Sequence, residues 1–573
     1  MTRTLAKARR LIRLVGARHE ALEIGRNRLV AMAAVFALGF LLIGGRLVSL
    51  TLDVGETEPT VARSGGAAPS TERADIVDRN GVVLASSLPT AALYANPRDV
   101  LDPVETARAI STLFPDVAYD SLLARLRSET TFVWIKRSLT PRQKYEVNRL
   151  GLPGVYFQRG ERRVYPHGNA ASHVIGLTDV DGRGLTGAEQ YFDARLKDGS
   201  GPLQLSLDIR AQTVLRDTLA ESVARFGALG GSAIMLDVRN GEIVALVSLP
   251  DFDPNQPSQA VGEAAFNRTT KGVYEMGSTF KVLTTAIALE TGTVNLQDGY
   301  DASTPIRVGG FTISDFHGKK RWLSVPEILV YSSNIGAAKM AVDIGAKNFR
   351  SYLDRLGLLT PAHLELPEVG DPLSPQRWRD INTMTIGFGH GIAVSPVQMA
   401  AAVAATVNGG TIRPASILVQ SGQPHGTRVF SDETSRRIRE LLRLVVTNGT
   451  GRKADVPGYQ VGGKTGTAEK LGGRGYRADS LVSSFIGIFP GDDPAYVVLA
   501  LLDEPKGIAE TQGNATGSWT AAPMVGQLVQ RLGPLLGVAP GVVTAQGQIA
   551  SEAQLIFTRA TGARSGERRL ATN

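Results

Sequence analysis

The sequence contains no cysteine at any of its 573 positions. Disulfide bonds, thiol catalysis and cysteine-based metal sites are therefore excluded, and an exported chain of this kind needs no oxidative folding. Histidine is scarce: its seven copies are scattered without metal-ligand spacing, so we expect neither a metal nor another cofactor. With 43% hydrophobic and 6% aromatic residues, the chain can still form two or more packed domains.

Basic residues outnumber acidic ones, but the excess is concentrated at the N-terminus. The net charge is +8, and residues 1–28 alone hold eight Lys or Arg against two Glu, a balance of +6. Only +2 remains for the rest of the chain, which argues against a basic groove that follows nucleic-acid phosphates. The sequence therefore predicts a basic tail at residues 1–28 and no nucleic-acid partner.

An apolar segment follows this tail. Leu29 to Gly45 carries no charge, and the apolar run resumes after Arg46 and continues to Leu50. At about 1.5 Å per residue, a helix over 29–50 is long enough to cross a bilayer core. A cleaved signal peptide is the rival interpretation, but the run is too long for one and no clear cleavage site follows. We expect a single-pass anchor at 29–50 in the inner membrane, with the tail cytoplasmic and the remainder periplasmic.

Composition divides the remainder of the chain. Residues 51–72 are rich in Gly, Ala, Pro, Ser and Thr and predict a flexible linker. Residues 73–205 mix short β-like runs, at 92–94 and 132–135, with charged helical stretches and carry no catalytic constellation. Residues 206–535 place apolar strands, at 232–237, 243–247 and 496–502, on either side of helices near 278–290, 326–344 and 396–407. This order predicts an α+β fold, a sheet with helices packed on it, and we expect a disordered tail at 536–573.

Three short motifs occur once each, all of them between residues 206 and 535. They are Ser278-Thr279-Phe280-Lys281, Ser332-Ser333-Asn334 and Lys464-Thr465-Gly466. A lone Ser-x-x-Lys is usually a helix cap with a solvated charge. The set of three, in this order, is typical of serine enzymes that recognise penicillin.

The first motif predicts a nucleophile and its base. Val282 to Glu290 indicates a buried helix, and positions i and i+3 of a helix share a face, so Lys281 can reach the Ser278 hydroxyl. Serine becomes a good nucleophile only when a base removes its proton. Lysine can be that base only if burial or a nearby cation lowers its pKa. Lys464 is our candidate for that cation, and it could also attract an anionic group of the substrate.

The other two motifs predict substrate contacts. Gly462 to Thr467 is glycine-rich, which suits either a turn or an open strand edge on which a peptide can lie. The backbone N–H groups of Ser278 and Thr467 could form an oxyanion hole, and the hydroxyls of Thr465 and Thr467 could bind a terminal carboxylate. Ser332 could relay a proton and Asn334 could bind an amide, although Ser-Ser-Asn is more commonly a helix cap.

On these motifs the sequence resembles the class B penicillin-binding proteins, and most closely their division-specific (septal) type. Further segments extend the likeness along nearly the whole chain: Arg73–Ala85, Arg163–Pro166, His173–Gly176, Gly184–Glu189, Tyr274–Gly277 and Gly387–Gln398. At Met276 many relatives carry proline instead. This position is next to the first motif, but it is not one of the residues expected to act in catalysis. The family's fold implies a transpeptidase domain at 206–535 on a non-catalytic pedestal, also called a dimerisation domain, at 73–205.

The resemblance also implies an activity, peptidoglycan D,D-transpeptidation. Ser278 would be the acylated nucleophile and Lys281 its general base, with Ser332, Asn334 and Lys464 completing the catalytic set. Thr465, Gly466 and Thr467 would bind substrate, a stem peptide ending in D-alanyl-D-alanine. β-Lactams would acylate Ser278, and the implied partners are a membrane glycan polymerase and other cell-division proteins.

Two short stretches match nucleotide-binding motifs but lack the structural context that these motifs require. Gly458 to Thr465 matches the phosphate-binding P-loop, but Pro457 and Gly458 precede the motif where a buried strand is required. Several glycines follow where a helix is required. Gly182 to Gly187 satisfies G-x-G-x-x-G without a surrounding βαβ unit, so we interpret it as a turn.

Other serine-based functions remain open to different degrees. A membrane-anchored β-lactamase would need a deacylating base, and none is recognisable in this sequence. A β-lactam sensor would need a sizeable cytoplasmic signalling part. A bifunctional synthase would need a glycosyltransferase domain, for which residues 73–205 are too few. An elongation-specific transpeptidase is the main alternative, and a non-catalytic scaffold of the division complex is the binding-protein alternative.

Overall fold

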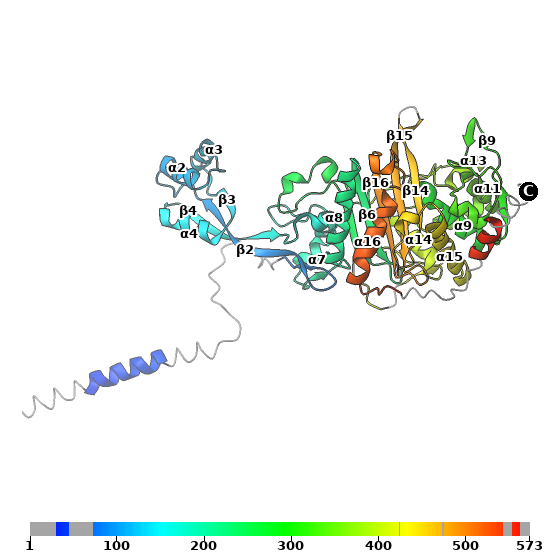
Figure 1. Cartoon of the computed structure of the whole chain (residues 1–573). Coiled ribbons are helices and arrows are strands. Elements are labelled where there is room, and N and C mark those ends of the chain that lie inside the picture. Colours follow the sequence, from blue (N-terminus) through cyan, green and yellow to red (C-terminus); the bar gives the residue numbers. More distant parts are fainter. Residues whose placement is uncertain (1–29, 45–72, 423–424, 473–474, 542–552, 562–573) are drawn as a thin grey trace, which may run out of the picture. The chain divides into compact units, whose positions relative to one another are not determined.

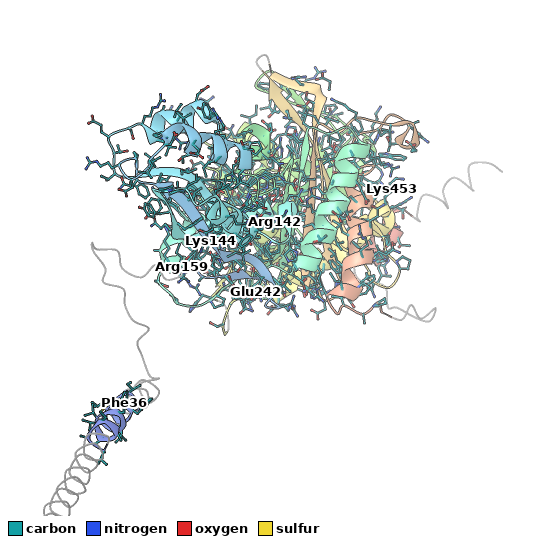
Figure 2. All side chains as sticks on the ribbon, turned by 90° about the vertical axis from the view of Figure 1, so that its left-hand side faces the viewer. Phe36, Arg142, Lys144, Arg159, Glu242 and Lys453 are labelled. Carbon is teal, nitrogen blue, oxygen red and sulfur yellow. The ribbon has the colours of Figure 1, made fainter. Side chains whose placement is uncertain are left out.

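The computed structural model describes residues 30–44, 73–422, 425–472, 475–541 and 553–561 (Figure 1). Residues 1–70 and 71–573 form two units. In the first unit, residues 30–44 form a helix on which Phe36 is an exposed apolar side chain (Figure 2). Among the described residues, no helix combines the length and apolar character needed to cross a membrane.

Several of the predicted segments fall outside the described ranges. These are the basic tail at 1–28, residues 29 and 45–50 of the predicted anchor, and the predicted linker at 51–72.

A five-stranded sheet organises the N-terminal part of the larger unit. Its longest strand, β2, pairs antiparallel with β1, β3 and β4, and β1 pairs parallel with β5. The β-like runs predicted at 92–94 and 132–135 overlap β2 and β3. Leu93, Ile110 and Leu122 belong to one small core between this sheet and its helices. The elements are β1 (Ile76–Val77), β2 (Val83–Ala95), β3 (Val133–Leu139), β4 (Val155–Val164), β5 (Leu203–Gln204), α2 (Pro103–Leu113), α3 (Tyr119–Leu126) and α4 (Pro141–Leu150).

A second five-stranded sheet, entirely antiparallel, lies at the centre of the larger unit. Its strand order is β14-β15-β16-β6-β7, so β14 is an edge strand. The strands predicted at 232–237, 243–247 and 496–502 fall in β6, β7 and β16. Their bounds are β6 (Gly230–Asp237), β7 (Ile243–Leu249), β14 (Gly462–Gly472), β15 (Gly475–Phe489) and β16 (Tyr496–Asp503).

Both faces of this sheet are covered. Alternate residues of a strand point to opposite faces: along β16, Leu499 and Leu501 lie in one core, whereas Val498 and Ala500 lie in the other. Helices α8 (Ile209–Arg225) and α16 (Ala521–Leu535) cover the second face, and α14 (Pro396–Val407) lies in the core of the first. The predicted α+β fold is therefore correct (Figure 1).

The predicted helix at 326–344 is instead two helices, α10 (Val325–Val330) and α11 (Asn334–Ile344). The break has a local cause. Ser332 adopts φ +58°, which a helix cannot continue, and Ser333 then caps α11 by accepting a hydrogen bond of 3.0 Å from Gly336 N. The second motif is therefore a turn between two helices.

The remaining elements surround the sheets. They are α5 (Ser172–Ile175), α6 (Gly187–Tyr191), α7 (Asp193–Lys197), α9 (Lys281–Glu290), α12 (Ala346–Arg355), α13 (Asp380–Ile386), α15 (Asp432–Asn448), β8 (Gly299–Asp301), β9 (Ile306–Val308), β10 (Phe311–Ile313), β11 (Trp322–Ser324), β12 (Thr411–Ile412) and β13 (Thr427–Arg428), with short 3₁₀ turns that include η1 (Gly168–Ala171) and η4 (Gly277–Phe280).

A buried carboxylate ties together segments that are distant in sequence. Glu189 is fully buried and accepts hydrogen bonds from Arg73 Nε at 2.6 Å and Arg163 Nε at 2.8 Å. Arg73 also donates to Asp193 Oδ1 at 2.7 Å. Arg73, Arg163 and Glu189 come from three of the segments that carry the family likeness in the N-terminal part, so those segments form one structural junction.

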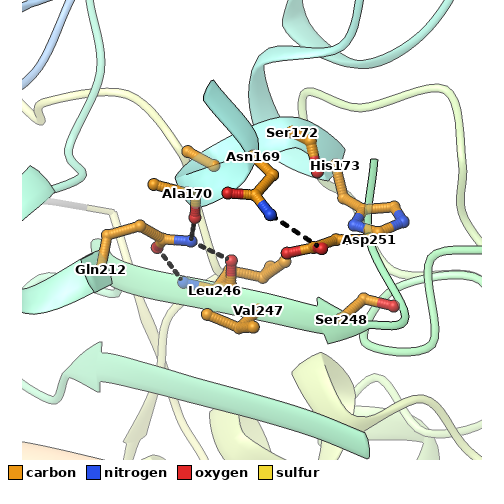
Figure 3. Close-up of a pocket in the computed structure, with 10 residues that line it drawn as sticks. Asn169, Ala170, Ser172, His173, Gln212, Leu246, Val247, Ser248 and Asp251 are labelled. Atoms are coloured by element: carbon orange, nitrogen blue, oxygen red, sulfur yellow. Dashed lines mark hydrogen bonds between the residues drawn. The ribbon is translucent and has the colours of Figure 1, made fainter. Parts of the chain in front are cut away.

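A second junction joins η1 to α8 and β7 (Figure 3). The side-chain amide of Gln212 donates to Ala170 O at 2.8 Å and to Leu246 O at 2.7 Å, and it accepts from Leu246 N at 2.8 Å. Asp251 accepts hydrogen bonds from Asn169 at 3.3 Å and from Arg216 at 2.6 Å. The start of the central sheet is thereby fixed to the segment that precedes it.

The predicted disordered tail at 536–573 is only partly within the described residues. Residues 553–561 form a helix, contrary to that expectation, and Ala553 and Phe557 are 0% and 6% exposed. Burial of one face against the domain explains why this segment is ordered.

Candidate active site

Ser278 and Lys281 lie at the turn where η4 becomes α9. The Lys281 Nζ lies 2.9 Å from Ser278 Oγ, as the i, i+3 spacing predicts, and the Lys281 side chain is fully buried. Gly277 precedes them at φ +53°, and a Cβ on it would lie 2.6 Å from the Thr467 carbonyl oxygen. Only glycine allows η4 to approach β14 this closely.

Two acceptors orient the Lys281 amine. Its Nζ lies 2.7 Å from Ser332 O and 2.7 Å from Asn334 Oδ1, both of which can only accept hydrogen bonds. A neutral amine has two N–H groups and one lone pair. With both N–H groups donated to these oxygens, the lone pair is left for the Ser278 hydroxyl.

The surroundings favour that neutral form. Burial lowers the pKa of Lys281 well below its ordinary value, and the charge of Lys464 lowers it further, while Asp315 opposes both. Burial also lowers the pKa of Lys464, to about 7. Both buried amines therefore lose their protons more readily than an exposed lysine does.

Ser332 connects the two lysines. Its Oγ lies 3.1 Å from Lys281 Nζ and 3.0 Å from Lys464 Nζ. The left-handed backbone at φ +58° is uncommon for a residue other than glycine. Such strain persists where the surrounding structure fixes the residue, and it is frequent at functional sites.

Asp315 is a site residue that the sequence reasoning missed. It accepts hydrogen bonds from Ser333 Oγ at 2.7 Å and from Ile335 N at 3.0 Å, which fixes the turn before α11. One residue earlier, Ser314 O accepts from Asn334 Nδ2 at 3.0 Å and so orients the amide. Asp315 lies outside the three motifs, so the sequence around it gave no indication that it holds the turn before α11.

The third motif lies on the edge strand β14. Lys464 is fully buried. At Gly466, a Cβ would lie 2.3 Å from Ser484 Oγ and 2.7 Å from Met276 O, so a side chain is excluded there. The strand can therefore pack directly against the turn that carries Ser278.

The two threonine hydroxyls of this strand already have partners. Thr465 Oγ1 lies 2.7 Å from Thr450 Oγ1, and Thr467 Oγ1 accepts from Gly517 N at 3.2 Å. An accepting hydroxyl keeps its own proton, so Thr467 can still donate to a ligand.

A partly exposed polar cluster lies beside the nucleophile. Glu275 accepts hydrogen bonds from Gly391 N at 2.8 Å and from the Tyr476 hydroxyl at 2.9 Å. Burial, and then the charge of Lys281, lowers the pKa of His390 to about 4, which keeps this ring neutral. The sequence reasoning singled out 387–392 and 274–277 only as family-like segments.

The described residues contain no group of three or more His, Asp or Glu that could hold a metal ion. The sequence match to a phosphate-binding P-loop does not agree with the fold. Gly462 begins the strand β14, and its hairpin partner β15 follows, whereas a P-loop requires a helix at this point.

Comparisons with known proteins agree with this geometry. A model of the penicillin binding protein transpeptidase domain matches residues 231–530, and a model of the penicillin-binding protein dimerisation domain matches residues 69–208. The probable peptidoglycan D,D-transpeptidase FtsI of Caulobacter vibrioides is 41% identical over 517 residues, which cover 87% of each chain. The chain belongs to the class B penicillin-binding proteins.

Other relatives of this penicillin-binding protein are more distant. The probable peptidoglycan D,D-transpeptidase PenA of Neisseria gonorrhoeae is 34% identical, covering 83% of this chain and 86% of that one. Peptidoglycan D,D-transpeptidase FtsI of Escherichia coli K12 is 30% identical, covering 83% and 85%.

Solved structures share the fold of this penicillin-binding protein. Penicillin binding protein 3 of Mycobacterium tuberculosis, complexed with aztreonam, superposes with a TM-score of 0.65 at 24% identity and covers 83% of this chain and 99% of that one. A peptidoglycan synthetase from Bifidobacterium adolescentis gives 0.66 at 22% identity, covering 84% and 98%. All three motifs lie inside the matched transpeptidase region.

Proposed function

We propose that this protein is a serine D,D-transpeptidase that cross-links peptidoglycan stem peptides during septal cell-wall synthesis. The observation that carries the proposal is the 2.9 Å approach of a fully buried Lys281 amine to Ser278 Oγ. A base with a lowered pKa beside a serine hydroxyl is the requirement for nucleophilic catalysis.

In the first half-reaction, Lys281 takes the proton of Ser278, and Oγ attacks the carbonyl carbon between the two terminal D-alanines. The backbone N–H groups of Ser278 and Thr467 stabilise the resulting oxyanion. The carbon–nitrogen bond then breaks, and the proton passes from Lys281 through Ser332 to the departing amine. D-Alanine leaves, and the remaining peptide is bound to Ser278 as an ester.

In the second half-reaction, an amine of a neighbouring stem attacks the ester carbonyl. The amine loses a proton to the Ser332–Lys281 pair, the carbon–oxygen bond breaks, and Ser278 regains its proton. One new peptide bond replaces the one that was cleaved. Water in place of the amine would give carboxypeptidase activity by the same steps.

Substrate binding follows from the third motif. A peptide lying along the edge strand β14 would bring its terminal carboxylate to Lys464 and to the hydroxyls of Thr465 and Thr467. A bound carboxylate favours the charged form of Lys464. Asn334, held by Ser314 O, would orient the amide of the stem peptide.

The septal role and the division partners rest on the relatives. The proteins of Caulobacter vibrioides and Escherichia coli are both named peptidoglycan D,D-transpeptidase FtsI. By likeness to them, we propose a membrane glycan polymerase and other cell-division proteins as partners. Filamentation on depletion would support this role, whereas rounding would support the elongation-specific alternative.

The proposed location is the inner membrane, with the catalytic domain in the periplasm. The helix at 30–44 carries apolar side chains that are largely exposed, Phe40 at 71% and Leu41 at 72%. Apolar side chains exposed all round a helix favour insertion into lipid. The basic residues that precede this helix favour a cytoplasmic N-terminus.

Intact-mass measurement of the full-length protein after incubation with penicillin G tests the activity. We expect a stable adduct on the wild type and on the control Ser303→Ala, whose serine is exposed, but none on Ser278→Ala. A folded wild type without an adduct would contradict the proposal. Rapid turnover of the drug would assign the protein to the β-lactamases instead.

A further inference from the structure

The helix at 553–561 lies beyond residue 530, where the match to the transpeptidase domain ends. It packs on the catalytic unit with one face (Figure 1, red). Ala553 and Phe557, one turn apart, belong to the main core, whereas Leu555 between them is 48% exposed. This one-sided burial is that of an amphipathic helix docked on a surface.

Phe557 contacts the residue next to the second motif. Its ring centroid lies 6.0 Å from that of Tyr331, with the two planes tilted by 48°. Centroids of interacting aromatic pairs lie about 4.5–7 Å apart. Two cations contact the same tyrosine ring: Lys319 Nζ lies 4.6 Å and the Arg321 guanidinium 5.9 Å from its centroid. The Tyr331 ring is thus held by the C-terminal helix and by the segment that follows Asp315.

Tyr331 is the C-cap residue that follows α10, and one peptide bond joins it to Ser332. That serine has a strained backbone and positions its hydroxyl between the two lysine amines. Asp315 fixes the turn on the side of Ser333. On the other side lies Tyr331, whose ring contacts Phe557.

We propose that the C-terminal helix positions the second motif, and that Phe557 is a positioning residue for acylation that acts through Tyr331. Removing the Phe557 ring releases one side of the Tyr331 ring, so Ser332 spends less time between Lys281 and Lys464. The inference rests on the proposed function, because it concerns the rate at which Ser278 is acylated.

Acylation of the full-length protein by penicillin G, followed over time by intact mass, tests this role. We compare wild type, Phe557→Ala, Phe557→Tyr and a deletion of residues 553–573, with Leu555→Ala as the matched control on the exposed face. The expected result is a loss of acylation rate at saturating drug of roughly tenfold to a hundredfold for Phe557→Ala and for the deletion. The apparent dissociation constant should stay unchanged, and Phe557→Tyr and Leu555→Ala should behave as wild type.

A double variant identifies the path. If Phe557 acts through Tyr331, Tyr331→Leu combined with Phe557→Ala loses no more rate than the more damaging single variant. Rate losses that multiply would overturn the route through Tyr331.

Three outcomes separate this inference from the proposed function. A wild-type adduct with unchanged rates in Phe557→Ala and in the deletion overturns the inference alone. If fewer Phe557→Ala molecules react but those that do react at the wild-type rate, the substitution has only reduced the folded fraction. This outcome also overturns the inference. Absence of an adduct on folded wild type removes the proposed function, and the inference with it.

Discussion

The Lys464 amine lies 3.0 Å from Ser332 Oγ, the same oxygen that lies 3.1 Å from the Lys281 amine. One hydroxyl thus separates a proposed base from a proposed anion-binding cation. Since the charge of Lys464 lowers the pKa of Lys281, the two lysines cannot be altered independently.

Replacing Lys281 by alanine should lower the rate of acylation by penicillin G by about 10² to 10⁴-fold, because the serine loses its base. Lys281→Arg should be as slow, since guanidinium stays protonated at any usable pH. The exposed Lys347→Ala is the control and should acylate as wild type. Acylation of both Lys281 variants at the wild-type rate would assign the base elsewhere.

The second-order rate constant of acylation should fall as pH rises through about 7, where burial places the pKa of Lys464. Above that pH the free enzyme loses the cation that attracts the drug carboxylate, so the decrease should approach about tenfold per pH unit. Lys470→Arg, on the same strand, should retain this alkaline limb. A rate that stays flat well above neutral pH would contradict the role of Lys464.

Lys464→Met should abolish fast acylation and yet stabilise the fold near neutral pH. The pKa of Lys464 falls from 10.5 to about 7 on folding, so the folded state binds fewer protons between these values. The burial penalty is therefore fully present below about pH 7 and decreases up to 10.5. Urea unfolding should show Lys464→Met more stable by a few kcal/mol below pH 7, with the difference lost near pH 10.5. Equal stability at all pH values would show that Lys464 is not buried as a charge.

Glu189→Gln should destabilise the protein by about 3–5 kcal/mol, because the buried cations Arg73 and Arg163 would lose the charge of Glu189, although Arg73 keeps its pair with Asp193. Denaturant unfolding measures this change. Glu146→Gln is the matched control: its pair with Arg142, labelled in Figure 2, is a surface i, i+4 contact worth less than about 1 kcal/mol. Similar losses in the free energy of unfolding for the two variants would show that water reaches the contacts of Glu189 with Arg73 and Arg163.

The sequence was most informative where chemistry follows from helix or strand geometry. The spacing of Ser278 and Lys281 predicts their contact because a helix puts i and i+3 on one face. Strands β6, β7 and β16 of the central sheet were recognisable because burial on both faces demands continuous apolar runs, whereas β15 was not predicted and β14 was left as either a turn or a strand edge.

Sequence reasoning failed where long-range contacts decide the structure. The break at Tyr331 to Ser333 depends on Asp315, which lies in an irregular segment with no periodic pattern. The helix at 553–561 is too short to be stable by itself, and its order comes from burying Ala553 and Phe557 against the domain. The partners of Glu189 lie far from it along the chain, so no local pattern reveals them.

The central sheet also constrains how the molecule is made. β6 ends at Asp237, but its neighbour β16 begins only at Tyr496, and the edge strand β14 joins the sheet through β15. Pairing between strands so distant in sequence is slow and must wait for the later one. During synthesis, Ser278 therefore emerges long before the strand that carries Lys464. The active site therefore cannot form until β14, β15 and β16 have all been synthesised.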